Sequence, residues 1–184
     1  IDRKSQMSLS SGSNNTSADA IAYKSLAVNL SDLAAMGADP AWFTLSLTLP
    51  GDNDWPVDYR EQWLQQFSRA LFSLAADHNI QLIGGDTTHG SLAVTIQVCG
   101  YLEPGKALQR STAQPGDLIA VTGKLGAAAL GLDLVLGNNS KQTQTLSERY
   151  KQQAIKALNY PQARIKEGLF LKHIAHSALD LSDG

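Results

Sequence analysis

The sequence is poor in cysteine and carries no excess of either charge. Cys99 is the only cysteine among 184 residues, which excludes an internal disulfide and a thiolate metal cage. The 15 Lys and Arg residues against 17 Asp and Glu residues give a formal net charge of -2, so there is no broad basic field for nucleic acid or an anionic membrane. The chain also lacks an apolar run of roughly 20 residues and a secretory signal pattern. We therefore expect a cytoplasmic protein with a small-molecule partner.

Hydrophobic residues make up 43% of the chain, enough for one sizeable core or two small ones. The segment 8–18 is polar and without apolar periodicity, which is typical of a flexible connection. A turn-rich stretch, 104–117, predicts a domain boundary. We expect a flexible segment or a remnant of cloning at 1–17, an amino-terminal domain at 18–105 and the start of a second domain at 106–184.

Strands and helices alternate on both sides of this boundary, which indicates an α+β or α/β fold. Helical periodicity predicts helices at 17–37, 59–78, 126–136, 148–158 and 162–174. Apolar runs and period-two alternation predict strands at 43–49, 80–83, 92–98, 118–122 and 178–181.

Aspartates at or near the ends of these elements are the candidate site residues. Asp32 lies in the first, almost wholly apolar helix, where it either faces solvent or binds a partner. Asp86 follows Gly84 and Gly85, which come directly after a predicted buried strand. It is either a ligand beside a backbone that the two glycines leave accessible, or part of a tight turn.

The last candidate segment is Asp180, Leu181, Ser182, Asp183 and Gly184, which is either a ligand group or an Asp-rich turn. Carboxylates this close repel one another unless a cation lies among them. Oxygen ligands of this kind suit Mg²⁺ bridging a polyphosphate. Arg110 could pair with a phosphate or be a solvated arginine of the connection.

Several ordered motifs resemble one enzyme family. Tyr23 to Pro40 reads YKSLAVNLSDLAAMGADP, and QLIGGDTTHG starts at Gln81. An Arg-Ser pair at Arg110 precedes Pro-Gly-Asp from Pro115, and DLSDG starts at Asp180. From about residue 20 to residue 184 the sequence is similar to bacterial thiamine-monophosphate kinases, which belong to a superfamily with aminoimidazole ribonucleotide synthetase.

The resemblance implies a two-domain, synthetase-like fold whose amino-terminal mixed sheet pairs in a homodimer. It implies ATP-dependent phosphorylation of thiamine monophosphate to thiamine diphosphate by direct in-line transfer, with no residue assigned as general acid or base. It also implies several Mg²⁺ ions. The motifs that match the family assign metal ligands and nucleotide contacts to residues of this sequence. The metal ligands are Asp32, Asp86, Asp180 and Asp183, and the ATP contacts are Gly85, Asp86, Arg110 and Ser182.

Two features of the family are missing from the sequence. Residues 1–19 show neither the acidic Gly-Asp-Asp segment nor the Ser-Thr-Asp metal motif that precede this helix in full-length members. We therefore expect both ends to be cut and this polypeptide alone to be inactive. The alternatives are another ATP-dependent synthetase of the same superfamily, or an inactive fragment that only dimerises.

Overall fold

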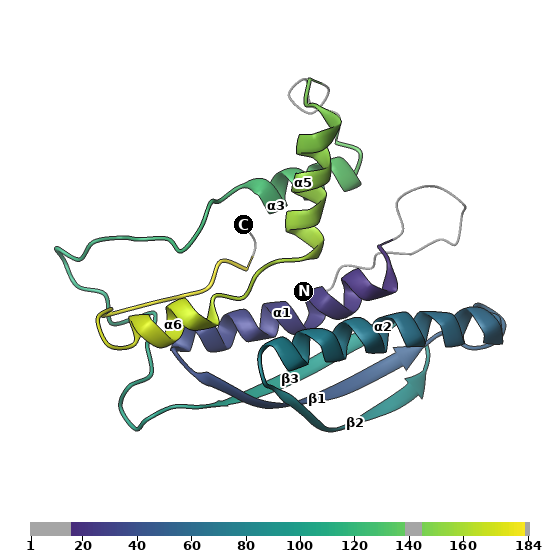
Figure 1. The fold of residues 1–184 in the computed structure, drawn as a ribbon, viewed down its shortest axis with the longest axis horizontal. Helices are drawn as coiled ribbons and strands as arrows, with labels where there is room; N and C mark the ends of the chain where they lie inside the picture. The colour runs from purple at the N-terminus through teal and green to yellow at the C-terminus, as the bar shows by residue number, and fades with distance from the viewer. Residues whose placement is uncertain (1–15, 139–144, 183–184) are drawn as a thin grey trace.

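The computed structural model describes residues 16–138 and 145–182, and it is a mixed α/β structure (Figure 1). Two long helices lie on one face of a three-stranded sheet, and the described residues of the second half of the chain form three shorter helices. In the described residues no helix is long and apolar enough to cross a membrane. The prediction of a mixed fold of helices and strands is confirmed.

Helix α1 (Ala18–Met36) forms where the apolar periodicity predicted it. Leu26 and Leu30 are fully buried in it. The helix ends at Gly37, whose left-handed backbone (φ 70°) lets its own N–H donate to the carbonyl oxygen of Ala34 and the N–H of Ala38 donate to that of Leu33. Most faces of α1 are covered, since it contacts α2, β3, α5 and α6, and this explains why its sequence is apolar almost all round.

The sheet has the order β2-β1-β3, so β1 (Asp39–Leu49) is the central strand. It pairs in parallel with β2 (Gln81–His89) and antiparallel with β3 (Ala93–Tyr101). Phe43, Leu47 and Leu49 are buried on the helix side, which confirms the alternation seen in the sequence. A parallel pair needs a long crossover, and α2 (Val57–Asp77) supplies it.

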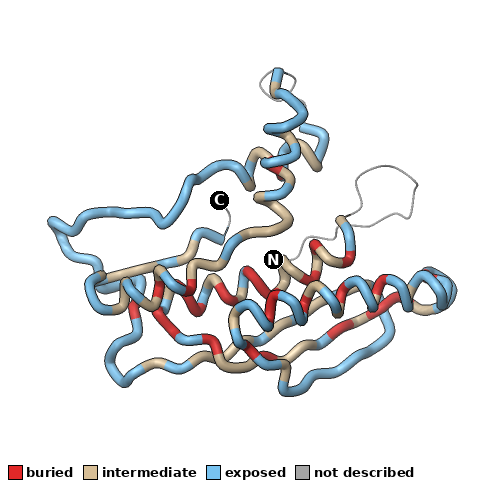
Figure 2. Tube along the Cα trace, in the orientation of Figure 1, coloured by how far each residue is buried: buried red, intermediate tan, exposed pale blue. Residues whose placement is uncertain are grey.

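The hydrophobic core lies between the sheet and the two long helices, where Figure 2 shows the buried segments. Trp63, Phe67, Leu71 and Leu74 of α2 step at helical spacing toward it and are at most 5% exposed. Ile165 of the later helix α6 belongs to the same core cluster. The second half of the chain is thus packed directly on the first.

The second strand differs from its prediction. The sequence predicted a short buried strand over 80–83 that stops at Gly84 and Gly85, whereas β2 continues through both glycines to His89. None of its residues is fully buried, because β2 is an edge strand. The Gly-Gly-Asp motif therefore lies within a strand, and the prediction that a turn follows the strand here is wrong.

The second half of the chain is helical in the residues that the structure describes. Helices α3 (Ala127–Val135) and α5 (Glu148–Asn159) confirm their predictions, and α6 (Ile165–Leu171) is shorter than the predicted 162–174. The strands predicted at 118–122 and 178–181 are absent: Leu118 and Ile119 are 97% and 99% exposed. A strand needs a partner for its backbone N–H and C=O groups, and no described strand lies beside these segments.

The division of the chain after residue 105 stays a prediction. Beyond β3 the described residues contain helices and one isolated parallel bridge between Gln109 and Ser177.

Candidate functional site

Two of the predicted segments meet α1 near its carboxyl end. Asp32 is an exposed residue about one turn before Met36, the last residue of the helix. The backbone N–H of Leu108 donates to the carbonyl oxygen of Met36 at 3.1 Å, and the Leu108 side chain is buried. This contact fixes the connection that follows β3 against the helix, two residues before Arg110. The carboxylate of Asp32 and the segment of Arg110 therefore belong to the same region.

Asp180 enters this region from the other end of the chain. Partial desolvation of the Asp32 carboxyl group by the atoms around it, and secondly the negative charge of Asp180, raise the pKa of this group above its ordinary value. Asp32 and Asp180 therefore lie in the same region of the structure. The hydroxyl of Ser182 donates to Oδ2 of Asp180 at 3.0 Å. A pair of neighbouring carboxylates with only oxygen donors fits a hard divalent cation such as Mg²⁺.

Asp86 occupies a different place. The strand register pairs Asp86 with Ser46 of β1. Two residues further on, Thr88 is paired with Thr48, and the hydroxyl oxygens of these two threonines are hydrogen-bonded at 3.1 Å. These side chains point to the sheet face that the helices leave uncovered. Oδ1 of Asp86 accepts the backbone N–H of Thr87 at 2.8 Å. Asp86 therefore does bond its own neighbouring backbone, as expected if it has a local structural role rather than a ligand role.

Gly85 has a structural reason to be glycine. Its φ is 154°, and a Cβ built there would lie 1.8 Å from the carbonyl oxygen of Leu45 in the neighbouring strand. At Gly84 a Cβ would meet nothing within 4 Å. The close approach of β1 to β2 thus requires Gly85 but not Gly84, whatever either residue does with a nucleotide.

The remaining predicted residues are accessible. Arg110 and Ser182 are exposed, whereas Asp183 lies outside the described residues. Within residues 16–138 and 145–182 no group of three or more His, Cys, Asp or Glu side chains could hold a metal ion. The structure brings Asp32 and Asp180 together, and the convergence of all four predicted carboxylates stays a prediction.

One pair of polar residues was missed from the sequence. Nδ1 of His176 lies 2.8 Å from Oδ1 of Asp117, although the two residues are 59 apart in the chain. Asp117 is the last residue of the Pro-Gly-Asp motif, but nothing in the spacing indicated a histidine partner. In the sequence His176 stands out only through His173, three residues earlier, and two histidines without a third ligand do not make a zinc site.

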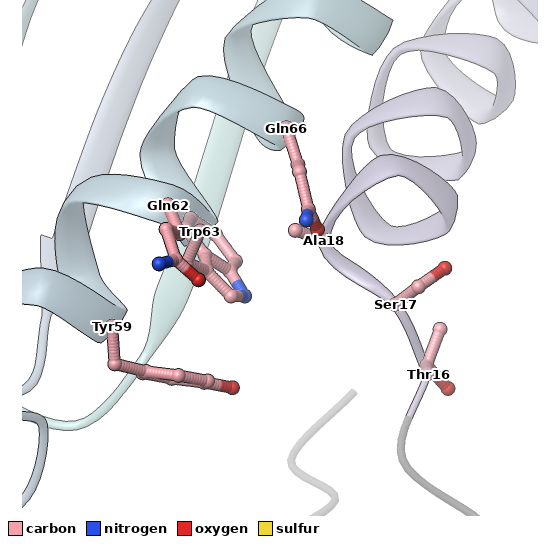
Figure 3. Close-up of a pocket in the computed structure, with 7 residues that line it drawn as sticks. All are labelled: Thr16, Ser17, Ala18, Tyr59, Gln62, Trp63 and Gln66. Atoms are coloured by element: carbon pink, nitrogen blue, oxygen red, sulfur yellow. The ribbon is translucent and has the colours of Figure 1, made fainter.

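A small cavity of about 150 Å³ lies elsewhere, between the amino end of α1 and α2 (Figure 3). None of the predicted site residues lines it, so it is not a candidate for the nucleotide site. Its lining residues are Thr16, Ser17, Ala18, Tyr59, Gln62, Trp63 and Gln66.

The fold is a mixed α/β domain in which two motif aspartates, Asp32 and Asp180, lie in one region. Residues 4–102 match the family described as AIR synthase related protein, N-terminal domain, and the chain belongs to this family. The match begins before residue 20, where the resemblance to the kinases starts.

Relatives within this family have a common description. The chain is 51% identical over 164 residues to the thiamine-monophosphate kinase of Salmonella typhimurium (strain LT2), covering 89% of this chain and 47% of that protein. It is similar in fold to the thiamine-monophosphate kinase of Stenotrophomonas maltophilia K279a, with a TM-score of 0.78, 45% identity and coverage of 92% and 51%.

A second similar structure is AaThiL complexed with AMPPCP and TMP. It has a TM-score of 0.74 and 24% identity, with coverage of 89% of this chain and 49% of that one, so the likeness shows the fold. The chain spans about half the length of the curated relatives it matches.

Proposed function

We propose that the protein to which this sequence belongs is a cytoplasmic, Mg²⁺-dependent kinase that phosphorylates thiamine monophosphate with ATP. The observation that carries the proposal is that Asp180, from the other end of the chain, acts by its negative charge on the pKa of Asp32, so that two motif aspartates lie in the same region. The identity of 51% to a thiamine-monophosphate kinase supports this substrate. AaThiL, complexed with AMPPCP and TMP, supports the pairing of an ATP analogue with a thiamine phosphate at this fold.

In the proposed reaction a phosphate oxygen of thiamine monophosphate forms a bond to the γ-phosphorus of ATP. The bond from that phosphorus to the β,γ-bridging oxygen breaks, which gives thiamine diphosphate and ADP. The attacking oxygen is already anionic at neutral pH, so no general base is assigned. Positioning and electrostatic stabilisation supply most of the catalysis in transfers of this kind.

The residues of this chain have distinct proposed roles. Asp32, Asp86, Asp180 and Asp183 would be the ligands of Mg²⁺. Bound Mg²⁺ would mask the repulsion between the two phosphate-bearing substrates. Arg110 would pair with a phosphate, and Gly85 and Ser182 would contact the nucleotide.

The test is nucleotide binding by an Asp180→Asn variant. We expect its affinity for Mg-AMPPCP, measured by calorimetry, to fall by roughly tenfold or more, since even outer-shell partners of a metal site are worth that much. Asp54→Asn, which changes an exposed loop carboxylate in the same way, is the matched control. Equal affinity of both variants and the original chain would contradict the assignment. Release of ADP from ATP in the presence of thiamine monophosphate, measured with the longer protein to which this sequence belongs, tests the reaction itself.

We also propose that the protein is a homodimer that pairs through the uncovered sheet face. That face carries exposed Ser46, Asp86 and Thr95, and an edge-to-face pair of Trp42 and Tyr101 with ring centroids 5.3 Å apart. Asp86, on this face, would enter the site at the interface between the two copies. Sedimentation of the chain and of a Ser46→Arg variant tests this arrangement, because the added cation should convert a dimer to a monomer.

A further inference from the structure

Two segments that are distant in sequence are joined by a group of polar contacts, which we name the clasp. The connection after β3 supplies one side and the segment after α6 supplies the other. Gln109 and Ser177 form a parallel backbone bridge. The hydroxyl of Thr112 lies within hydrogen-bond distance of the carbonyl oxygens of both Gln109 and His176. The clasp consists of Gln109, Thr112, Asp117, His176 and Ser177.

The side-chain part of the clasp fixes Asp117 through both of its oxygens. Oδ1 accepts from Nδ1 of His176 at 2.8 Å, and Oδ2 accepts from the backbone N–H of Gln114 at 2.8 Å. The N–H of Gln114 and then the His176 contact lower the pKa of Asp117, so the carboxylate is ionised at neutral pH. A carboxylate whose two oxygens each accept a hydrogen bond has a more fixed orientation than one with a single hydrogen-bond donor.

Predicted site residues flank the clasp on both sides. Arg110 follows Gln109 directly, and Asp180 comes four residues after His176. The segment from Ala178 to Ser182 belongs to no helix or strand, so the bridge and the His176 contact are its nearest anchors to the rest of the chain. The negative charge of Asp32 repels Asp180 and would push this segment away.

We propose that the Asp117–His176 pair is a positioning device that holds Asp180 beside Asp32 and at a fixed offset from Arg110. The pair acts through the backbone of the segment: His176 contacts Asp117, and none of the predicted nucleotide contacts. It resists the mutual repulsion of Asp32 and Asp180, so that both carboxylates face the metal before a cation arrives. This role rests on the proposed function, because it presumes that Asp180 binds metal.

The test compares three variants of the 184-residue chain. His176→Ala removes the donor to Asp117. His176→Asn keeps an N–H close to the position of Nδ1 and should rescue the contact. His173→Ala is the matched control, since His173 is an exposed histidine three residues earlier whose side chain has no hydrogen-bond partner in the described residues.

Two measurements are made on each variant. Hydrogen exchange of the amides of 177–182, without nucleotide, reports whether the segment is held. We expect about fivefold faster exchange in His176→Ala, from the loss of one charged hydrogen bond, and no change in the other two variants. Calorimetry then measures AMPPCP binding with Mg²⁺ and with EDTA. We expect His176→Ala to weaken binding about fivefold with Mg²⁺ and to leave it unchanged with EDTA, because Asp180 acts on the nucleotide through the metal.

The outcomes separate the positioning role from the proposed function. If the original chain binds Mg-AMPPCP and His176→Ala binds it equally well, the positioning role is refuted while the kinase proposal stands. An equal loss with and without Mg²⁺ also refutes it, because it indicates a general structural effect. If the unsubstituted 184-residue chain and the Asp54→Asn control both bind no Mg-AMPPCP, the proposed function is refuted. The positioning role is then refuted as well, because it depends on that function. Rescue by His176→Asn supports the proposal.

Discussion

Two neighbouring glycines in β2, Gly84 and Gly85, should differ in their response to substitution by alanine: only the change at Gly85 should destabilise the fold. Gly85→Ala places a methyl group 1.8 Å from the carbonyl oxygen of Leu45, a backbone atom that cannot rotate away. The φ of 154° adds conformational strain for any residue with a Cβ. Gly84→Ala meets nothing within 4 Å and is the matched control.

The expected cost of Gly85→Ala combines two contributions. A non-glycine residue in such a backbone conformation costs about 1–3 kcal/mol, and overpacking costs a similar amount. The free energy of unfolding should therefore fall by about 2–6 kcal/mol, which corresponds to a fall in Tm of roughly 5–25 °C for a chain of this size. Gly84→Ala should stay within about 0.5 kcal/mol of the original chain.

Urea and thermal denaturation, followed by circular dichroism, measure both variants. Equal stabilities of Gly84→Ala and Gly85→Ala would refute the reasoning, because only Gly85 is predicted to lie against the neighbouring backbone. AMPPCP binding by a stably folded Gly84→Ala protein is informative in addition. A loss of affinity without a loss of stability would place the nucleotide near this backbone.

Two further predictions concern the contacts between the halves of the chain. The hydroxyl of Tyr160 donates to Oδ2 of Asp19 at 2.5 Å; this bond lowers the pKa of Asp19 from its ordinary 3.8 and raises that of Tyr160 from its ordinary 10.0. On the acid side, the bond stabilises the fold fully above the ordinary pKa of Asp19, and this stabilisation is lost as the pH falls through the lowered pKa of Asp19. On the alkaline side, it stabilises the fold fully below the ordinary pKa of Tyr160, and this stabilisation is lost as the pH rises through the raised pKa of Tyr160. Tyr160→Phe keeps the ring contact with Tyr23, so urea titrations should show a loss of about 1 kcal/mol near pH 7 that shrinks at both extremes; a difference independent of pH would contradict this. Gly168→Ala should lower the free energy of unfolding by about 1–3 kcal/mol, because its Cβ would lie 2.0 Å from the carbonyl oxygen of Ala34. Gly51→Ala, in open space, should be nearly neutral in the same thermal scans.

The elements of the first half could be predicted from the sequence because their patterns and stop signals agree. Gly37 ends α1 and Pro50 ends β1, and the apolar spacing between such signals is regular. The course of β2 could not be predicted in this way. Its glycines look like a strand end, and only the position of Leu45 in the neighbouring strand explains why Gly85 lies inside it.

The failures in the second half have another cause. The letters of 118–122 suit a strand, but strand formation depends on a partner that the local sequence does not specify, and Leu118 is left exposed. For the site, the aspartates of the motifs could be singled out as oxygen ligands. The nearness of Asp32 to Asp180, and of Asp117 to His176, depends on tertiary packing, which spacing alone does not reveal.

The apolar helix α1 also limits how the molecule can move. It packs on α2 and the sheet on one side and on α6 on another, so the two halves of the chain have one helix in common. Opening between them cannot be a free swing about the connection after β3: α6 would have to slide along α1, with Gly168 against Ala34 as the tight point. A protease that cuts the exposed stretch 111–125 should therefore leave two pieces that still migrate together under native conditions.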